Sequence, residues 1–216
     1  METNEITIRP FEARDKNSVR SICCDTAFMG ENVTNFFEDR EIFADFAISY
    51  YTDYEPESLF VVQSKEKVSG YIAGCCDTKR YAKIFESRIL PKAILKCLTK
   101  GVLLKPKARN FILNTLKSFL KGEFNRPQVS EGYPAHLHIN VDRRARGTGI
   151  GFMLMNFFLR RLKEKNIPAV HLCSISKTGQ AFFSKFGFDI LYSKKVSYFD
   201  YLLKEEQRLI CFGKKL

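Results

Sequence analysis

A glycine-rich turn between a strand pattern and a helix pattern is the feature that most limits how this chain folds. The turn reads Arg146-Gly-Thr-Gly-Ile-Gly151, follows a largely apolar stretch at 135–141, and precedes a helical pattern that continues to about residue 165. The first N–H groups of a helix have no acceptor within the helix, and they lie at the positive end of its dipole. Glycine lets an anion approach such a backbone closely. We therefore predict a phosphate-binding turn at 146–151.

The residues around the turn distinguish three kinds of nucleotide-binding motif. A P-loop requires a Gly-Lys-Ser or Gly-Lys-Thr sequence, which is absent, and a dinucleotide fingerprint requires a third glycine where Phe152 stands. Arg146-x-x-Gly149-x-Gly151 instead resembles the pyrophosphate loop of the Gcn5-related N-acetyltransferase (GNAT) superfamily. A second register that begins at Arg144 also fits, but in the first register the Gly-Ile-Gly sequence opens the helix, and we prefer it.

The resemblance extends beyond the turn. The residues that carry it are Tyr133-Pro-Ala-His-Leu-His-Ile-Asn-Val141, Val170-His-Leu172, Ala181-Phe-Phe-Ser-Lys-Phe-Gly-Phe188 and the hairpin that ends at 68–74. The stretch from Tyr133 to Ile139 is especially similar to the acetyltransferase-like relatives of O-GlcNAc hydrolases. Only the segment 79–122 has no counterpart in the family pattern.

The chain is expected to adopt an α/β (α+β) architecture, a GNAT fold with a mixed central sheet of about seven strands flanked by helices. We expect one domain over residues 1–216, with a basic helical insertion at about 79–125 between the third and fourth strands. Alternating and apolar runs predict strands at 5–10, 59–62, 68–76, 135–141, 169–173, 188–192 and 208–212. Periodicity of 3.6 residues predicts helices at 15–27, 38–51, 79–122 and 177–185, and a long helix that follows the glycine turn 146–151 and continues to about residue 165. Gly70 and Gly74 predict a bulge or a close backbone approach.

The resemblance implies acetyl-CoA as cosubstrate, bound between the strands at 135–141 and 169–173. The family pattern implies that the Val141 backbone holds the acetyl and pantetheine end and that the amides of 146–151 hold the pyrophosphate. The cofactor-binding residues so implied are Ile139, Val141, Arg146, Gly147, Thr148, Gly149, Ile150, Gly151, Ser174, Ser176 and Phe183. The implied activity is transfer of acetyl to an amine by direct attack.

Acetyl transfer requires a base for the ammonium group and is helped by a proton donor for the thiolate. Many family members have a tyrosine donor where this chain has Phe183, and an asparagine where it has Ser176. These departures favour, as an alternative, a non-catalytic acetyl-CoA-binding module. His136 and His138 are the candidate bases, and on a regular strand they share a face with Asn140.

Each histidine also has another interpretation. A histidine pair in this strand resembles the aralkylamine acetyltransferases, but His138 stands one residue closer to the glycine turn, which requires a bulge to restore the same orientation. Both histidines are equally compatible with structural hydrogen bonds. His136, His138, His171 and Cys173 include metal-ligand types, but no further residue supports a site, and we expect no metal.

The positive charge of the chain is concentrated in one segment. Residues 79–121 contain twelve Lys or Arg and one acid, Glu86, whereas the rest of the chain has 23 of each sign. Such a field attracts an anionic partner, although charge runs are often simply solvated helix faces. The alternatives are an acceptor that is anionic and an adaptor role with an acidic partner through 79–121. We do not expect nucleic acid as a partner, and we consider a homodimer.

Several absences bear on location. No apolar run approaches the roughly 18–20 residues of a membrane span, and the first residues lack the pattern of a signal peptide. The seven cysteines show no C-x-x-C spacing. We therefore expect a soluble cytoplasmic protein with reduced thiols.

Overall fold

The fold is organised around a seven-stranded mixed sheet. The computed structural model describes residues 6–64, 67–125 and 127–216. The strands are β1 (Ile6–Pro10), β2 (Leu59–Ser64), β3 (Lys67–Cys75), β4 (Ala135–Val141), β5 (Ala169–Ser174), β6 (Asp189–Val196) and β7 (Gln207–Lys215). Their order in the sheet is β1-β2-β3-β4-β5-β7-β6, and all neighbours are antiparallel except β4 and β5. The predicted α/β class and mixed sheet are confirmed.

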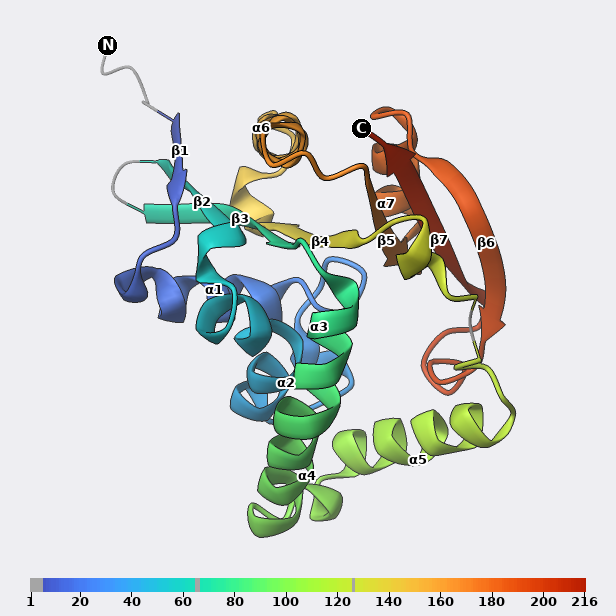
Figure 1. Cartoon of the computed structure of the whole chain (residues 1–216). Coiled ribbons are helices and arrows are strands. Elements are labelled where there is room, and N and C mark those ends of the chain that lie inside the picture. The colour runs from blue at the N-terminus through green and yellow to red at the C-terminus, as the bar shows by residue number, and fades with distance from the viewer. Residues whose placement is uncertain (1–5, 65–66, 126) are drawn as a thin grey trace.

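Helices cover both faces of this sheet (Figure 1). They are α1 (Lys16–Asp25), α2 (Arg40–Asp53), α3 (Thr78–Ile84), α4 (Leu90–Thr99), α5 (Pro106–Leu120), α6 (Ile150–Glu164) and α7 (Lys177–Ser184). Alternate residues of a strand point to opposite faces, so each strand contributes to two cores. On β3, Tyr71 and Ala73 belong to the core beneath α1 and α2, whereas Ile72 belongs to the core beneath α6 and α7.

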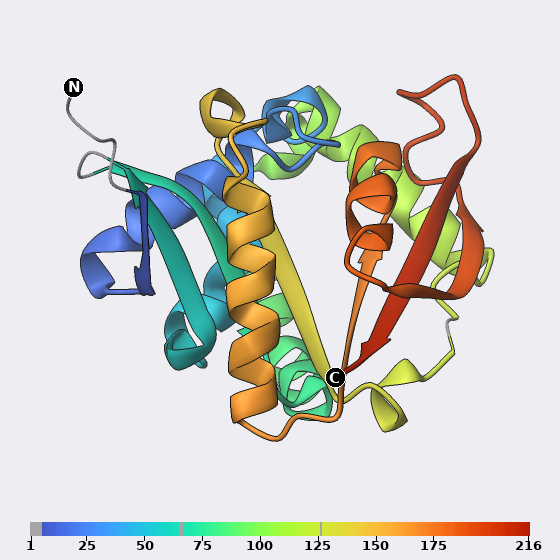
Figure 2. The same cartoon turned by 90° about the horizontal axis from the view of Figure 1, so that it is seen from above.

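The parallel pair β4 and β5 separates along its length. The strands pair only at Ala135 with Val170 and at His136 with His171. Figure 2 shows them meeting near one end and diverging toward the other, where α6 begins. The edge of β4 beyond His136 therefore has no strand partner on the side of β5 among the described residues. We call β4 and β5 the splayed pair; they are the two strands between which the resemblance implies that acetyl-CoA is bound.

Both interpretations of the β3 glycines hold. The register between β2 and β3 shifts at Val62 and Gln63, which face Gly70 and Val68, so there is a bulge beside Gly70. A Cβ on Gly74 would lie 2.2 Å from Cζ of Phe158 in α6, so Gly74 permits close approach of the helix.

The basic insertion lies between β3 and β4 and consists of α3, a π-helical turn (Phe85–Ile89), α4 and α5. The prediction of helix over 79–122 is correct in type, but Gly101, with φ of +60°, ends the first part and Pro106 begins the last. The carboxylate of Glu38 accepts hydrogen bonds from the N–H groups of Lys107 (2.9 Å) and Ala108 (2.8 Å) at the start of α5. At the other end, Glu123 accepts two hydrogen bonds from Ser197 in the β6–β7 connection. The insertion is thus fastened to the body at both ends of α5; that 1–216 form one domain stays a prediction.

Candidate functional site

The glycine turn joins β4 to α6 through a short 3₁₀ turn, Arg143–Ala145. Gly147 has φ of +77° and Gly149, the N-cap residue of α6, has φ of +86°. Side chains other than glycine adopt this left-handed region at a cost in free energy. The two glycines are therefore needed for the path of the backbone as well as for access to it.

The turn presents a row of unpaired donors. No described residue accepts a hydrogen bond from the backbone N–H groups of 147–152, and the first helical bond is from Met153 to the carbonyl of Gly149, at 3.0 Å. A Cβ on Gly147 or Gly149 would meet no atom within 4 Å, so the space above the turn is open. Donors that converge at the start of a 15-residue helix form an anion-binding cradle. We call the N–H groups of 147–152 the amide cradle.

Side chains in and next to the turn are already engaged by other parts of the chain. Nη2 of Arg146 donates to the carbonyl of Gly30 at 2.7 Å, and Arg143 forms an ion pair with Glu31 at 2.9 Å. The hydroxyl of Thr148 donates to the carbonyl of Ala145 at 2.6 Å, and Ile150 is buried. Arg146 and Thr148 thus shape the turn with their side chains and leave the backbone to meet a ligand.

Ser174, the last residue of β5, and Ser176, which comes just before α7, hold the start of α7. Oγ of Ser174 accepts from the N–H of Ser176 at 3.1 Å, and Oγ of Ser176 accepts from the N–H of Gly179 at 3.2 Å. Ser176 is therefore a helix cap. Both hydroxyls that the resemblance implies for cofactor binding already accept hydrogen bonds from the chain.

Phe183 lies in the core rather than at an open surface. It is buried, and its ring packs against Phe188 and Phe212. The neighbouring Phe182 is partly exposed instead, and its ring would lie 3.5 Å from a Cβ on Gly151. The sequence did not predict that Phe182 is the more exposed of these two residues. Which of them is exposed depends on the rotation of α7 about its axis, and the pattern of an eight-residue helix does not reveal that rotation.

His136 has both ring nitrogens engaged. Nδ1 lies 2.8 Å from Oγ1 of Thr78, and Nε2 lies 2.9 Å from Oη of Tyr51. The Thr78 hydroxyl donates its proton to the carbonyl of Pro134 at 2.8 Å, so it accepts from Nδ1–H of His136. Tyr51 then donates to Nε2. His136 is hence committed to structural hydrogen bonds.

His138 is held more loosely beside a tyrosine and an asparagine. Its Nδ1 lies 3.4 Å from Oη of Tyr71, and its Nε2 lies 3.5 Å from Nδ2 of Asn140. Nδ2 of Asn140 donates to the Tyr71 hydroxyl at 2.8 Å. The pairing of β4 with β3 is regular from Val141 to His136, so His136, His138 and Asn140 share one face, as predicted for a strand without a bulge. That face is turned toward α1 and α2 and away from α6.

Burial keeps both imidazoles neutral. It lowers the pKa of His136 to about 3, with smaller contributions from His171 and His138, and it lowers the pKa of His138 to about 4. Both imidazoles are therefore neutral at pH 7, and a pKa this far below 7 makes each of them a weak base. Among residues 6–64, 67–125 and 127–216, no group of three His, Cys, Asp or Glu is arranged to hold a metal ion.

Because His136 and His138 are buried in their neutral form, the free energy of unfolding of the chain depends on pH. Because the folded pKa lies below the ordinary value of 6.5, stability is complete above that pH and is lost as the pH falls toward the folded pKa. Between pH 6.5 and about pH 4, His136 should lower the free energy of unfolding of the unmodified chain by about 3 kcal/mol. Replacing His136 with glutamine should abolish this contribution. Urea unfolding of both proteins across this range measures the difference in slope; parallel curves would show that His136 is not held neutral.

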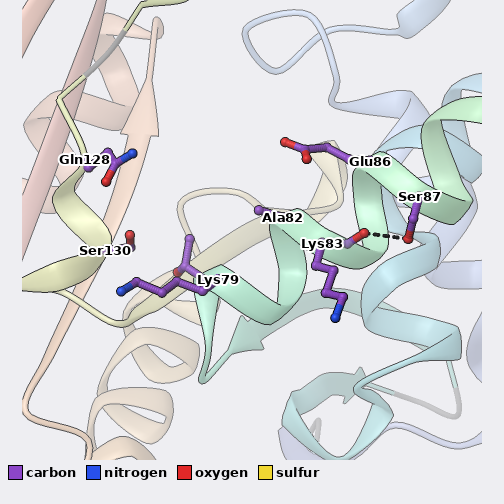
Figure 3. A pocket seen from close by; sticks show the side chains of 8 residues that line it. Lys79, Ala82, Lys83, Glu86, Ser87, Gln128 and Ser130 are labelled. Carbon is purple, nitrogen blue, oxygen red and sulfur yellow. Dashed lines mark hydrogen bonds between the residues drawn. The ribbon is translucent and has the colours of Figure 1, made fainter.

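A pocket adjoins the histidine end of the site (Figure 3). Its volume is about 760 Å³, and Thr78, which contacts His136, lies on its wall. The other lining residues are Lys79, Ala82, Lys83, Glu86, Ser87, Gln128 and Ser130. Figure 3 shows the side chains of α3 and the π-helical turn opposite the segment 128–130. Sequence reasoning did not find this pocket, because these two segments meet only in the folded chain.

Comparison with known proteins agrees with the geometry. Residues 114–188 match the model of the acetyltransferase (GNAT) family. The crystal structure of SsHAT shares 25% sequence identity, covers 98% of each chain and superposes with a TM-score of 0.72. The fold is the GNAT fold. Together, the family model and the similar structures support the GNAT superfamily.

Two other solved structures are similar to this chain. One is a polyamine N-acetyltransferase of Drosophila melanogaster, described as an enzyme that catalyses the formation of N-acetylagmatine; it has 14% identity, covers 98% of this chain and 100% of its own, and has a TM-score of 0.62. Ard1 from Thermoplasma volcanium has 18% identity, covers 98% and 97%, and has a TM-score of 0.55. At these identities the likeness concerns the fold. The similarity to relatives of O-GlcNAc hydrolases stays a prediction. In the described parts of this GNAT-like chain, no helix is both long and apolar enough for a membrane span.

Proposed function

We propose that this chain binds acetyl-CoA on the amide cradle and transfers the acetyl group to an amine. The observation that carries the proposal is the row of unpaired N–H groups at 147–152, placed where β4 and β5 diverge. The cradle would hold the pyrophosphate, and the unpaired edge of β4 at Ile139 and Val141 would hold the pantetheine. Acetyl-CoA supplies the acyl group as a thioester.

His138 is the residue that we assign to proton transfer. It is neutral, and its contacts of 3.4 and 3.5 Å leave it less committed than His136. It would take a proton from the acceptor ammonium, directly or through water, so that the amine nitrogen can form the C–N bond as the C–S bond breaks. We assign no side chain to protonation of the thiolate, because Phe183 has no proton to donate and is buried.

The pocket beside Thr78 suggests what the acceptor carries besides its amine. Lys79 and Lys83 line it together with Glu86. The two lysines suit a negative group on the acceptor, and the carboxylate suits an ammonium group. We therefore propose an acceptor with both charges, and a cytoplasmic location where acetyl-CoA is available.

A second candidate is an acetyl-CoA-binding module without turnover. It is favoured by the buried Phe183 and by the capping role of Ser176. Release of free thiol from acetyl-CoA, measured against a panel of polyamines, amino acids, amino sugars and peptide N termini, distinguishes the two. Amine-dependent release supports the transferase; binding of acetyl-CoA with no release by any amine class supports the module; absence of binding contradicts both.

A further inference from the structure

The basic insertion carries most of the large apolar side chains that are exposed to solvent. Ten of the fifteen exposed large apolar side chains among the described residues lie between 94 and 124. They are Ile94, Leu95, Leu98, Leu103, Leu104, Leu113, Leu116, Phe119, Leu120 and Phe124. Leu104 is 85% exposed and Leu120 is 77% exposed. Exposed leucines are ordinary where they are scattered singly, but these are concentrated in one segment of the chain. We call these ten residues the insertion surface.

The insertion surface projects from the rest of the molecule. Figure 1 shows α4 and α5 on the side of the sheet opposite α6, at the end of the molecule most distant from it. Leu98 lies in the last turn of α4, and Leu103 and Leu104 lie in the connection to α5. In α5, Leu113, Leu116 and Leu120 are spaced at i, i+3 and i+7 and so share one helix face. The surface is therefore available without disturbing the core.

Basic side chains accompany the exposed leucines. Of the twelve Lys and Arg in 79–121, Lys96 forms an ion pair with Asp45, and Lys100 and Lys105 both form ion pairs with Asp39. Lys92, Arg109 and Lys117 are exposed and form no ion pair with any described residue. Glu86 is the one acid of this sequence segment. The surface thus combines apolar side chains with uncompensated positive charge.

From this combination we infer that the insertion surface docks on an anionic lipid bilayer. Leucines that enter the interface between acyl chains and headgroups, with lysines that meet acidic headgroups, are the features of helices that lie on membranes. A second copy of the chain would bring two basic segments together and be repelled. Nucleic acid is bound chiefly by aromatic stacking and phosphate contacts, whereas eight of these ten side chains are leucine or isoleucine.

Vesicle flotation tests the inference, without acetyl-CoA, so its outcome is independent of the proposed transferase activity. The full chain should bind vesicles that contain about 30% phosphatidylserine at least tenfold more tightly than vesicles of phosphatidylcholine alone, and salt should weaken the binding. The chain contains no tryptophan, so Leu103→Trp provides a clean reporter whose emission should shift to shorter wavelength on anionic vesicles.

Matched variants separate the surface from general effects. Leu98→Ser/Leu104→Ser should weaken binding about tenfold, whereas Ile190→Ser should not, although Ile190 in β6 is 61% exposed and Leu98 is 62% exposed. Lys92→Glu/Lys117→Glu should weaken binding by roughly 25-fold or more, and Lys185→Glu/Lys204→Glu should have a smaller effect. All these side chains are exposed, so folding should be retained.

Three results would overturn the inference. The first is no preference for anionic vesicles. The second is equal loss in the insertion variants and their controls. The third is a dimer, or a nucleic-acid complex, that the insertion variants abolish while vesicles are not bound by the unmodified chain.

Discussion

Gly149→Glu should weaken acetyl-CoA binding at least 100-fold while the chain stays folded. The substitution places a carboxylate within the amide cradle, where it repels the pyrophosphate and competes for the N–H groups. Hydrogen bonds to charged groups contribute about 1.5–3 kcal/mol each, so loss of two accounts for a change of this size. A side chain at this position meets no atom within 4 Å of its Cβ, and the fold has room for it. Calorimetry gives the affinity, and circular dichroism the folded state.

Two variants control for the other effects of this substitution. Gly149→Ala introduces the strain of a positive φ of +86° without charge and should weaken binding about tenfold or less. Gly132→Glu adds the same charge at a glycine that also has open space around it and lies outside the turn; it should leave binding unchanged. Normal affinity in folded Gly149→Glu would refute the placement of the phosphates.

His138→Ala should lower kcat about 100-fold and leave the affinity for acetyl-CoA unchanged. General bases contribute roughly 10²–10⁴-fold to rate, and His138 lies on the face of β4 that is turned away from α6 and the glycine turn. The pKa of His138 is about 4, so the residue stays neutral near pH 7, and its titration should not change the rate there. The measurement is thiol release with the amine that gives turnover.

The matched control is His136→Ala in the same strand. It removes hydrogen bonds to Thr78 and Tyr51 and should cost stability, with a smaller effect on kcat than His138→Ala. An unchanged kcat in folded His138→Ala, or an equal loss in both variants, would contradict the assignment of His138.

The sequence predicted the elements that have strong local signals. The bounds of β4 agree because alternating residues end at a turn, and the start of α6 agrees because the glycines mark it. Strands β6 and β7 are longer than predicted, since the residues that extend them include Lys194 and Lys195 in β6 and Lys214 and Lys215 in β7, whose polar side chains carry no apolar signal. The composition of Phe85–Ile89 contains no signal that predicts a π-helical turn.

The sequence predicted only the part of the candidate site that is formed by backbone groups. The amide cradle follows from glycines that are adjacent in the chain. The difference between His136 and His138 depends on Thr78 and Tyr51, which are 58 and 85 residues from His136. Such partners meet through strand order and helix packing, which local patterns do not contain. The same reason explains why the pocket lined by Lys79 and Gln128 was not predicted.

Comparing acetyl-CoA with S-acetylpantetheine by calorimetry tests most directly whether the amide cradle holds a diphosphate. The two ligands share the thioester and the pantetheine, but only acetyl-CoA carries the pyrophosphate and the nucleotide. The unpaired N–H groups of 147–152 predict that the chain binds acetyl-CoA at least 100-fold more tightly. Equal affinity for the two ligands, or no binding of acetyl-CoA, would contradict the account.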